Sequence, residues 1–136
     1  MKHRFTNDYS SLCHPKILEA LSNLGEEQNV VYGLDKHSLK AETYIKDVFE
    51  SSKGQVYFIS GGTMTNLLFI SHVLKDYEAV IALETGHINV HETGAVEATG
   101  HKIITVKGSN GKIYLDDILN VLKLYKDEHM VKPKLV

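Results

Sequence analysis

The chain has 136 residues, of which 43% are hydrophobic and 24% charged, and its formal net charge is -2, a composition typical of one globular domain. The small net charge offers no basic surface to nucleic acid, and the single cysteine, Cys13, excludes an internal disulfide and suits a reducing compartment. No apolar run approaches the ~20 residues that cross a bilayer, so a cytoplasmic protein with no membrane partner is expected.

Helices and loops are predicted in the first part of the chain. Residues 1–14 form an arm or a short strand around Phe5. Apolar residues at helical spacing predict a helix over residues 15–24 that buries one face. Residues 26–36 are predicted to form a loop, and a second helix is predicted over about residues 38–50, with its first residue as the cap.

A glycine turn, residues 60–66, lies between a predicted strand and a predicted helix. Residues 55–59 are rich in β-branched and aromatic side chains and predict a buried strand, and apolar residues at helical spacing follow the turn. The first N–H groups of such a helix lack partners within the helix and attract phosphate, which indicates a phosphate site at Gly61, Gly62 and Thr63. The same turn also occurs for its geometry alone, with no ligand. No Lys-Ser or Lys-Thr pair follows the glycines, so a cofactor other than a nucleotide is favoured.

Three further strands are predicted after the glycine turn, over residues 79–83, 101–106 and 129–136, with a helix that begins at Asp116 before the last of them. Strands that alternate with helices predict an α/β fold of three layers with a mainly parallel sheet. Ligands of such sheets lie at the carboxyl ends of the strands, where the glycine turn and the loop that carries His87 are both expected.

Several short motifs occur in one order along almost the whole chain: Asn7-Asp8-Tyr9-Ser10, His14-Pro15, Tyr32-Gly33-Leu34-Asp35, Ser60-Gly61-Gly62-Thr63-x-Thr65-Asn66, Gly86-His87, Glu92-Thr93-Gly94, His129 and Lys134-Leu135-Val136. Together they resemble the threonine aldolases that depend on pyridoxal phosphate (PLP) and share the type I fold with aspartate aminotransferase. The resemblance implies a lyase that cleaves a β-hydroxy-α-amino acid to glycine and an aldehyde.

The resemblance also implies roles for individual residues. His87 matches the histidine that stacks on the PLP ring. Glu92 and His129 match groups near the β-hydroxyl of the substrate, where cleavage needs a base. The residues matched to the phosphate of PLP are Gly61, Gly62 and Thr63, and those matched to substrate binding are Asn7, Asp8 and Tyr32.

Each of these residues also has a plainer interpretation. His87 would be a surface or capping residue, Glu92 a carboxylate at a helix start, and His129 a solvated residue before a strand. His87 and His91 stand at the spacing of a helical metal pair, but no further ligand stands at metal-site spacing, so no metal is expected.

The family pattern includes residues that have no match in this sequence. The resemblance implies that residues 1–136 are the incomplete N-terminal part of a PLP-dependent domain. The Schiff-base lysine, the aspartate that pairs with the pyridine nitrogen and the arginines that bind the substrate carboxylate match no residue here. The full family pattern implies a homo-oligomer. The alternative is an inactive remnant that binds phosphate compounds or a partner chain.

The family's sheet order leads to a prediction about folding. The strand at 55–59 lies near one edge of that sheet, and the strands at 79–83 and 101–106 lie together at the other edge. The resemblance implies that the strands between them are absent here. We therefore expect either a marginal, aggregation-prone monomer or a rearranged sheet in which 55–59 pairs with 79–83.

Overall fold

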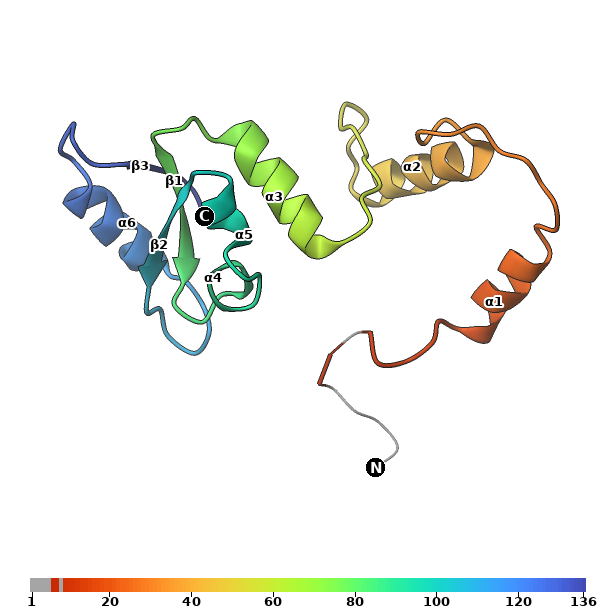
Figure 1. The fold of residues 1–136 in the computed structure, drawn as a ribbon, viewed down its shortest axis with the longest axis horizontal. Coiled ribbons are helices and arrows are strands. Elements are labelled where there is room, and N and C mark those ends of the chain that lie inside the picture. The colour runs from red at the N-terminus through yellow and green to blue at the C-terminus, as the bar shows by residue number, and fades with distance from the viewer. Residues whose placement is uncertain (1–5, 8) are drawn as a thin grey trace. The chain divides into compact units, whose positions relative to one another are not determined.

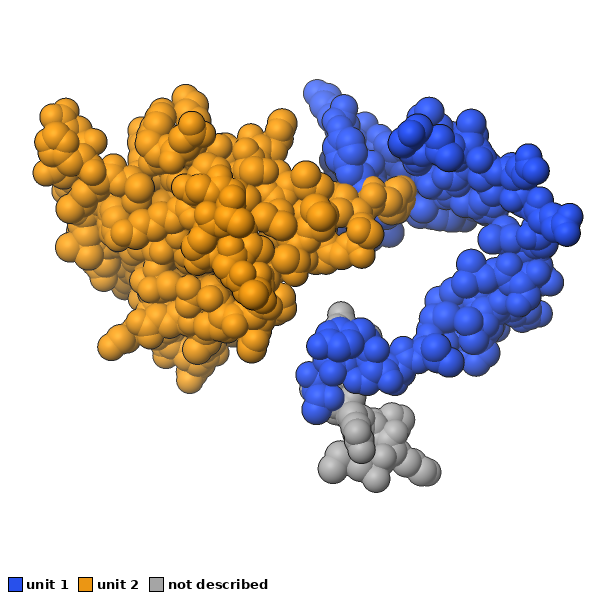
Figure 2. Space-filling model, viewed as in Figure 1, with its two compact units in different colours: residues 1–57 blue, residues 58–136 orange. Residues whose placement is uncertain are grey.

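A computed structural model describes residues 6, 7 and 9–136, so Asp8 and the strand predicted around Phe5 lie outside the described residues. The chain divides into two compact units, residues 1–57 and 58–136 (Figure 2). None of the helices in the described part of the chain is both long and apolar enough to span a bilayer.

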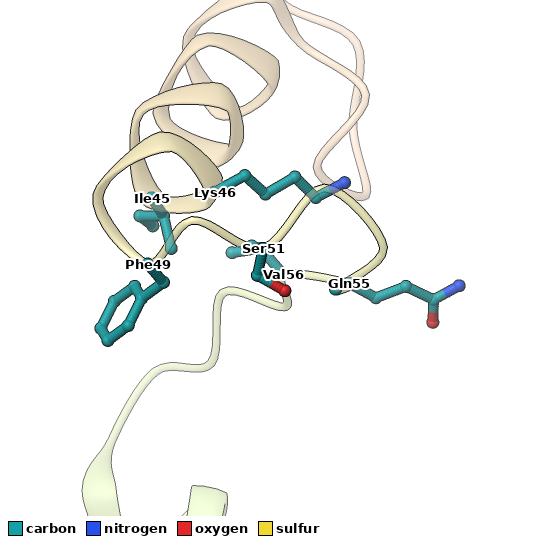
Figure 3. A pocket seen from close by; sticks show the side chains of 7 residues that line it. Ile45, Lys46, Phe49, Ser51, Gln55 and Val56 are labelled. Carbon is teal, nitrogen blue, oxygen red and sulfur yellow. The ribbon is translucent and has the colours of Figure 1, made fainter.

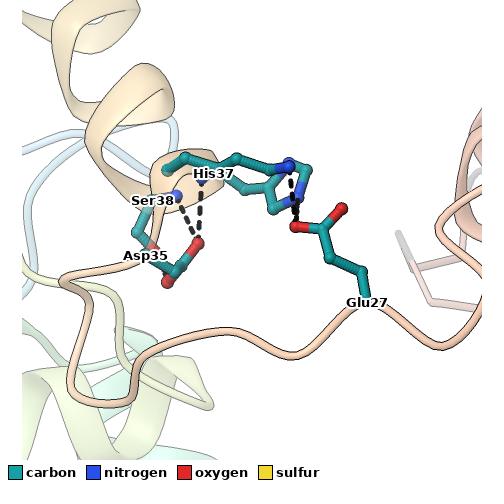
Figure 4. A network of polar contacts seen from close by, with 5 residues as sticks. Glu27, Asp35, His37 and Ser38 are labelled. Carbon is teal, nitrogen blue, oxygen red and sulfur yellow. Dashed lines mark hydrogen bonds and ion pairs between the residues drawn. The ribbon is translucent and has the colours of Figure 1, made fainter.

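The first unit contains two helices, α1 (Pro15–Ser22) and α2 (Lys36–Val48), close to the predicted positions. Helix α1 begins with a proline, whose missing N–H costs nothing at a helix start. Helix α2 begins two residues earlier than predicted, because Asp35 is its cap. The Asp35 Oδ1 atom accepts hydrogen bonds from the backbone N–H groups of His37 and Ser38 (Figure 4). The prediction of Ser38 as the cap was therefore wrong.

None of the described residues of the first unit is buried. The apolar faces of both helices were predicted to be covered, but Leu21 of α1 is 57% exposed and Phe49 at the end of α2 is 74% exposed. These helices therefore lack the tertiary packing that supplies most helical stability in proteins.

The strand predicted at residues 55–59 is not formed. Tyr57 and Phe58 remain 74% and 55% exposed. A β-strand exists only where its N–H and C=O groups pair with a neighbouring strand, so β-branched and aromatic residues alone cannot produce one. Of the two outcomes expected for this segment, the rearranged sheet in which it pairs with residues 79–83 is wrong, because both neighbours of that strand are other segments.

The second unit is built on a sheet of three parallel strands, β1 (Glu78–Leu83), β2 (Lys102–Val106) and β3 (Lys132–Leu135), in the order β2-β1-β3. All three strands were predicted from the sequence. The central strand β1 has the continuous apolar run of a strand covered on both faces, and five of its six residues are buried.

Helices cover both faces of this sheet (Figure 1). Helix α3 (Gly62–Val73) and the short helix α5 (Ala95–Ala98) pack on one face through a core that includes Ile70, Val80 and Val96. Helix α6 (Leu115–Leu124) packs on the other through Val121, which joins Ile81 in a second core. The prediction of a three-layer α/β arrangement with a parallel sheet is confirmed for this unit.

Candidate functional site

The candidate site lies in the second unit, beyond the carboxyl end of β1. The chain leaves this strand in a tight turn, in which the Gly86 N–H donates to the Leu83 carbonyl at 2.8 Å. The short helix α4 (His87–Val90) follows at once, so His87 stands at its first position. The backbone of parallel strands thereby delivers a histidine to the edge where ligands of α/β proteins bind.

Glu92 is the centre of a small polar network. Its side chain is fully buried, whereas the His87 side chain is 67% exposed. The Glu92 Oε1 atom lies 3.0 Å from His87 Nδ1 and accepts a hydrogen bond of 2.7 Å from Asn66 Nδ2. An ionised carboxylate can only accept hydrogen bonds, so a neutral His87 ring donates from Nδ1 and keeps a lone pair on Nε2.

The backbone after Glu92 is strained. Thr93 and Gly94 both adopt left-handed conformations, with φ angles of 55° and 74°. This conformation costs a residue other than glycine about 1–2 kcal/mol, so Thr93 is held there by its surroundings. The two residues turn the chain from the buried Glu92 into α5, whose Val96 is fully buried in the core.

The N-terminus of α3 has free hydrogen-bond donors. Gly61 is the cap and its lack of a side chain leaves the first helical N–H groups, those of Gly62 and Thr63, without a capping partner. The Thr65 hydroxyl is already engaged with the Gly61 carbonyl at 2.9 Å, whereas Thr63 is half-buried. Asn66 lies one helical turn beyond Gly62, so the Glu92 network joins this N-terminus to His87.

The glycines of this turn are not needed by the fold of the described chain. Gly61 has a φ of -177°, which any residue can adopt. A Cβ atom at Gly61 or Gly62 would meet no atom within 4 Å. A ligand that approaches the backbone closely would explain both glycines, since only glycine leaves room for it.

The remaining predicted site residues lie elsewhere. Asn7 and Tyr32 belong to the first unit, where Asn7 accepts hydrogen bonds from Tyr9 and Ser10 and Tyr32 is 95% exposed. Asp8 is outside the described residues. His129 precedes β3, which runs parallel to β1, so it lies at the opposite edge of the sheet from Glu92. Within the second unit, the structure brings His87 and Glu92 together but not His129.

Asn66 was missed as a site residue by reasoning from sequence. It belongs to the glycine-turn motif, but the motif alone assigns no role to its amide. Its position four residues after Gly62 places both on one face of α3, which is the signal that could have identified it.

One pocket lies apart from the site around Glu92. A pocket of about 200 Å³ in the first unit is lined by the end of α2 and the segment after it, including Ile45, Phe49 and Val56 (Figure 3). None of the predicted site residues lines it. No group of three or more potential metal ligands is found in the described ranges.

Three comparisons with known proteins each find similarity to lyases or threonine aldolases. The sequence profile of the Beta-eliminating lyase family matches residues 8–136. The low specificity L-threonine aldolases of Pseudomonas sp. (strain NCIMB 10558) and Pseudomonas aeruginosa are 30% and 29% identical to this chain over 133 residues. A solved structure of Leishmania major threonine aldolase matches with a TM-score of 0.90 and 48% identity over 94% of this chain. The chain spans 38% of the length of the curated relatives and 37% of that structure.

Proposed function

Since the chain belongs to the Beta-eliminating lyase family, whose profile covers residues 8–136, we propose that it is part of a PLP-dependent threonine aldolase-like lyase that cleaves a β-hydroxy-α-amino acid to glycine and an aldehyde. Its fold is part of the type I fold of the Leishmania threonine aldolase. The observation that carries the proposal is the contact of buried Glu92 with both His87 and Asn66, because it links the expected ring-binding histidine to the expected phosphate turn.

Enzymes of this family depend in general on PLP, and the residues present fit that cofactor. The uncapped N–H groups of Gly62 and Thr63, at the positive end of the α3 dipole, suit a phosphate. The absence of side chains at Gly61 and Gly62 leaves the space that a close phosphate needs. The exposed His87 ring is available to lie against a cofactor ring.

Two residues of this chain handle protons in the proposed site. Glu92 orients the His87 ring through Nδ1, so that the lone pair on Nε2 can accept a proton from a substrate hydroxyl. When bound, PLP supplies an acceptor for the negative charge that develops as the Cα–Cβ bond breaks. In this chain His129 lies at the other edge of the sheet, away from His87 and Glu92. The role of His129 at the hydroxyl stays a prediction.

The proposal also includes how the substrate is bound, how the domain is organised, and the location and oligomeric state of the protein. The substrate is an amino acid whose carboxylate is held with the help of Asn7, Asp8 and Tyr32. The chain forms one incomplete PLP-dependent domain with residues 1–14 as its arm, and the whole protein is a cytoplasmic homo-oligomer.

A second candidate is an inactive remnant that binds phosphate compounds or a partner chain. The exposed apolar faces of α1 and α2 favour it, because apolar faces of this extent are normally covered by other protein. This candidate predicts binding of a phosphate compound or of a partner chain, and no recovery of catalysis when the rest of the fold is supplied.

The test of the cofactor site is an NMR titration of the full chain with PLP and, separately, inorganic phosphate. We expect both ligands to shift the amide signals of Gly62 and Thr63. The Gly62→Ala variant adds a Cβ that meets no atom of the chain, so it should fold normally but bind phosphate more weakly. Amide signals that stay unchanged at saturating ligand would show that the segment is only a turn.

A further inference from the structure

We propose that Asn66 is a positioning residue of the candidate site: its amide fixes the buried carboxyl group of Glu92, which in turn holds the His87 ring in the tautomer with its proton on Nδ1. What the enzyme does with this ring rests on the proposed function. The tautomer itself can be measured in the chain without any cofactor.

The Asn66 hydrogen bond connects two elements that are distant in sequence. Asn66 is half-buried on α3, and Glu92 lies 26 residues later, beyond α4. At 2.7 Å, the Nδ2–Oε1 distance is short for a nitrogen donor, as expected when the acceptor is charged. The helix that carries the glycine turn therefore fixes the position of the carboxylate.

The Glu92 carboxyl group has few partners in the described chain. Oε1 faces both Asn66 and His87, whereas the buried Oε2 has no hydrogen-bond partner among the described residues. A buried carboxylate without donors is costly, so each donor matters more here than at the surface. Removal of the Asn66 amide would leave His87 as the one described donor to this group.

The His87 ring, by contrast, is not held by burial. It is 67% exposed, and its ring lies in a tilted contact with the ring of His91, 5.6 Å between centroids. A tilted contact of two imidazoles does not select which nitrogen carries the proton. The hydrogen bond to Glu92 Oε1 does select it, because the carboxylate accepts from Nδ1.

A purely structural role for Asn66 makes a different prediction. If the amide only ties α3 to the loop after α4, its removal lowers stability but leaves the His87 ring unchanged wherever the chain is still folded. The position of the ring proton therefore distinguishes the two roles.

The experiment records long-range proton–nitrogen spectra of the full chain labelled with ¹⁵N-histidine, at a pH at which the rings are neutral. The chain has 8 histidines, so the His87 signals are assigned by their absence in His87→Gln. In the unaltered chain we expect a protonated Nδ1 and an unprotonated Nε2. In Asn66→Ala and in Asn66→Leu, which keeps the side-chain volume without the donor, we expect both nitrogens to shift toward a mixture of tautomers.

The matched control is Ser71→Ala, which removes a hydrogen bond to a backbone carbonyl on the same helix and should leave the His87 signals in place. An unchanged Nδ1 proton in either folded Asn66 variant would overturn the proposal, as would a protonated Nε2 in the unaltered chain. Failure of the proposed function appears separately, as the absence of any phosphate response at Gly62 and Thr63.

Discussion

Single glycines in this chain serve different purposes. At Gly108 an added Cβ would lie 2.3 Å from the Lys112 carbonyl oxygen and 2.4 Å from Leu83 Cδ2, and φ is +60°. The fold itself therefore requires glycine at this position, which follows β2 in the chain and lies against Leu83 at the end of β1. At Gly61 and Gly62 an added Cβ meets nothing within 4 Å, so the reason for glycine there lies outside the described chain.

Gly108→Ala should destabilise the second unit strongly. The left-handed conformation costs alanine about 1–2 kcal/mol, and the steric overlap adds about 1–3 kcal/mol of overpacking. Urea unfolding followed by circular dichroism measures the loss. Gly100→Ala is the control, since its φ of +85° brings the conformational cost without any close contact. Equal losses in the two variants would contradict the steric argument.

At the scale of elements, the start of α2 shows how local polar groups define a helix without a core. The hydrogen bond from the Ser38 hydroxyl, followed by those from backbone N–H groups, holds the pKa of Asp35 below its ordinary value. The pKa of Glu27 is also lowered, chiefly by its hydrogen bond with Lys36. These surface groups are screened by water, so their contribution is small.

Acidification should loosen the first turn of α2. Because the pKa of Asp35 is lower in the folded state, its stabilising contribution is complete above the unfolded value of about 3.8 and is lost as the pH falls through the folded value. The amide signals of His37 and Ser38 report the loss. In Asp35→Asn the cap persists without a titrating group, so those signals should stay constant over the same range. A parallel acid shift in this variant would rule out Asp35 as the cause.

The segment 55–59 should exchange its amide protons rapidly. It forms no strand, and two of its aromatic side chains are mostly exposed, so neither pairing nor burial protects its backbone. The internal reference is β1, whose residues pair on both sides and should exchange slowly. Slow exchange throughout 55–59 in a monodisperse monomer would show that the expectation of a compromised fold is wrong.

At the scale of the whole molecule, burial is confined to the second unit. All the buried hydrophobic residues of the described chain lie between Ile70 and Val121. The first unit instead exposes apolar residues such as Leu18 and Val48. The exposed apolar surface of the first unit favours association of this chain with other protein, because contact with another protein would bury that surface.

The chain by itself should not cleave threonine at an enzymatic rate. It spans 38% of the length of the curated threonine aldolases that it matches. The resemblance to this family implies a Schiff-base lysine, an aspartate and arginines that match no residue of this sequence. Positioning alone can supply about 7–11 kcal/mol of a reaction barrier, so the deficit should reach many powers of ten. Glycine formation from threonine at a near-enzymatic rate, measured with added PLP and above the rate with PLP alone, would contradict this.

Activity should return when the rest of the fold is supplied as a second polypeptide, taken from the part of a Pseudomonas threonine aldolase that this chain does not match. Substitution of His87 or Glu92 by alanine in the complemented enzyme should then lower turnover by about 10²–10⁴, the range of general acid–base catalysis. The same substitution at His129 tests its predicted role. The inactive-remnant alternative predicts no recovery with any of these chains.

Sequence alone determined the features that depend on short stretches of chain. The apolar run at 79–83, the proline at the start of α1 and the helical spacing after the glycine turn each predicted the correct local structure, because helix starts and buried strands are specified by neighbouring residues. The motifs that resemble threonine aldolases predicted the family, and His87 was expected at the edge of the sheet where it lies.

Tertiary structure decided the features that depend on partners distant in the chain. Residues 55–59 have strand-forming side chains, yet a strand also needs neighbours to pair with, and none forms there. The role of Asn66 became visible only when α3 packed beside the loop that carries Glu92, 26 residues away. The edge at which His129 lies likewise follows from the parallel pairing of β3 with β1, since the direction of a strand is fixed by its neighbour in the sheet and not by its own sequence.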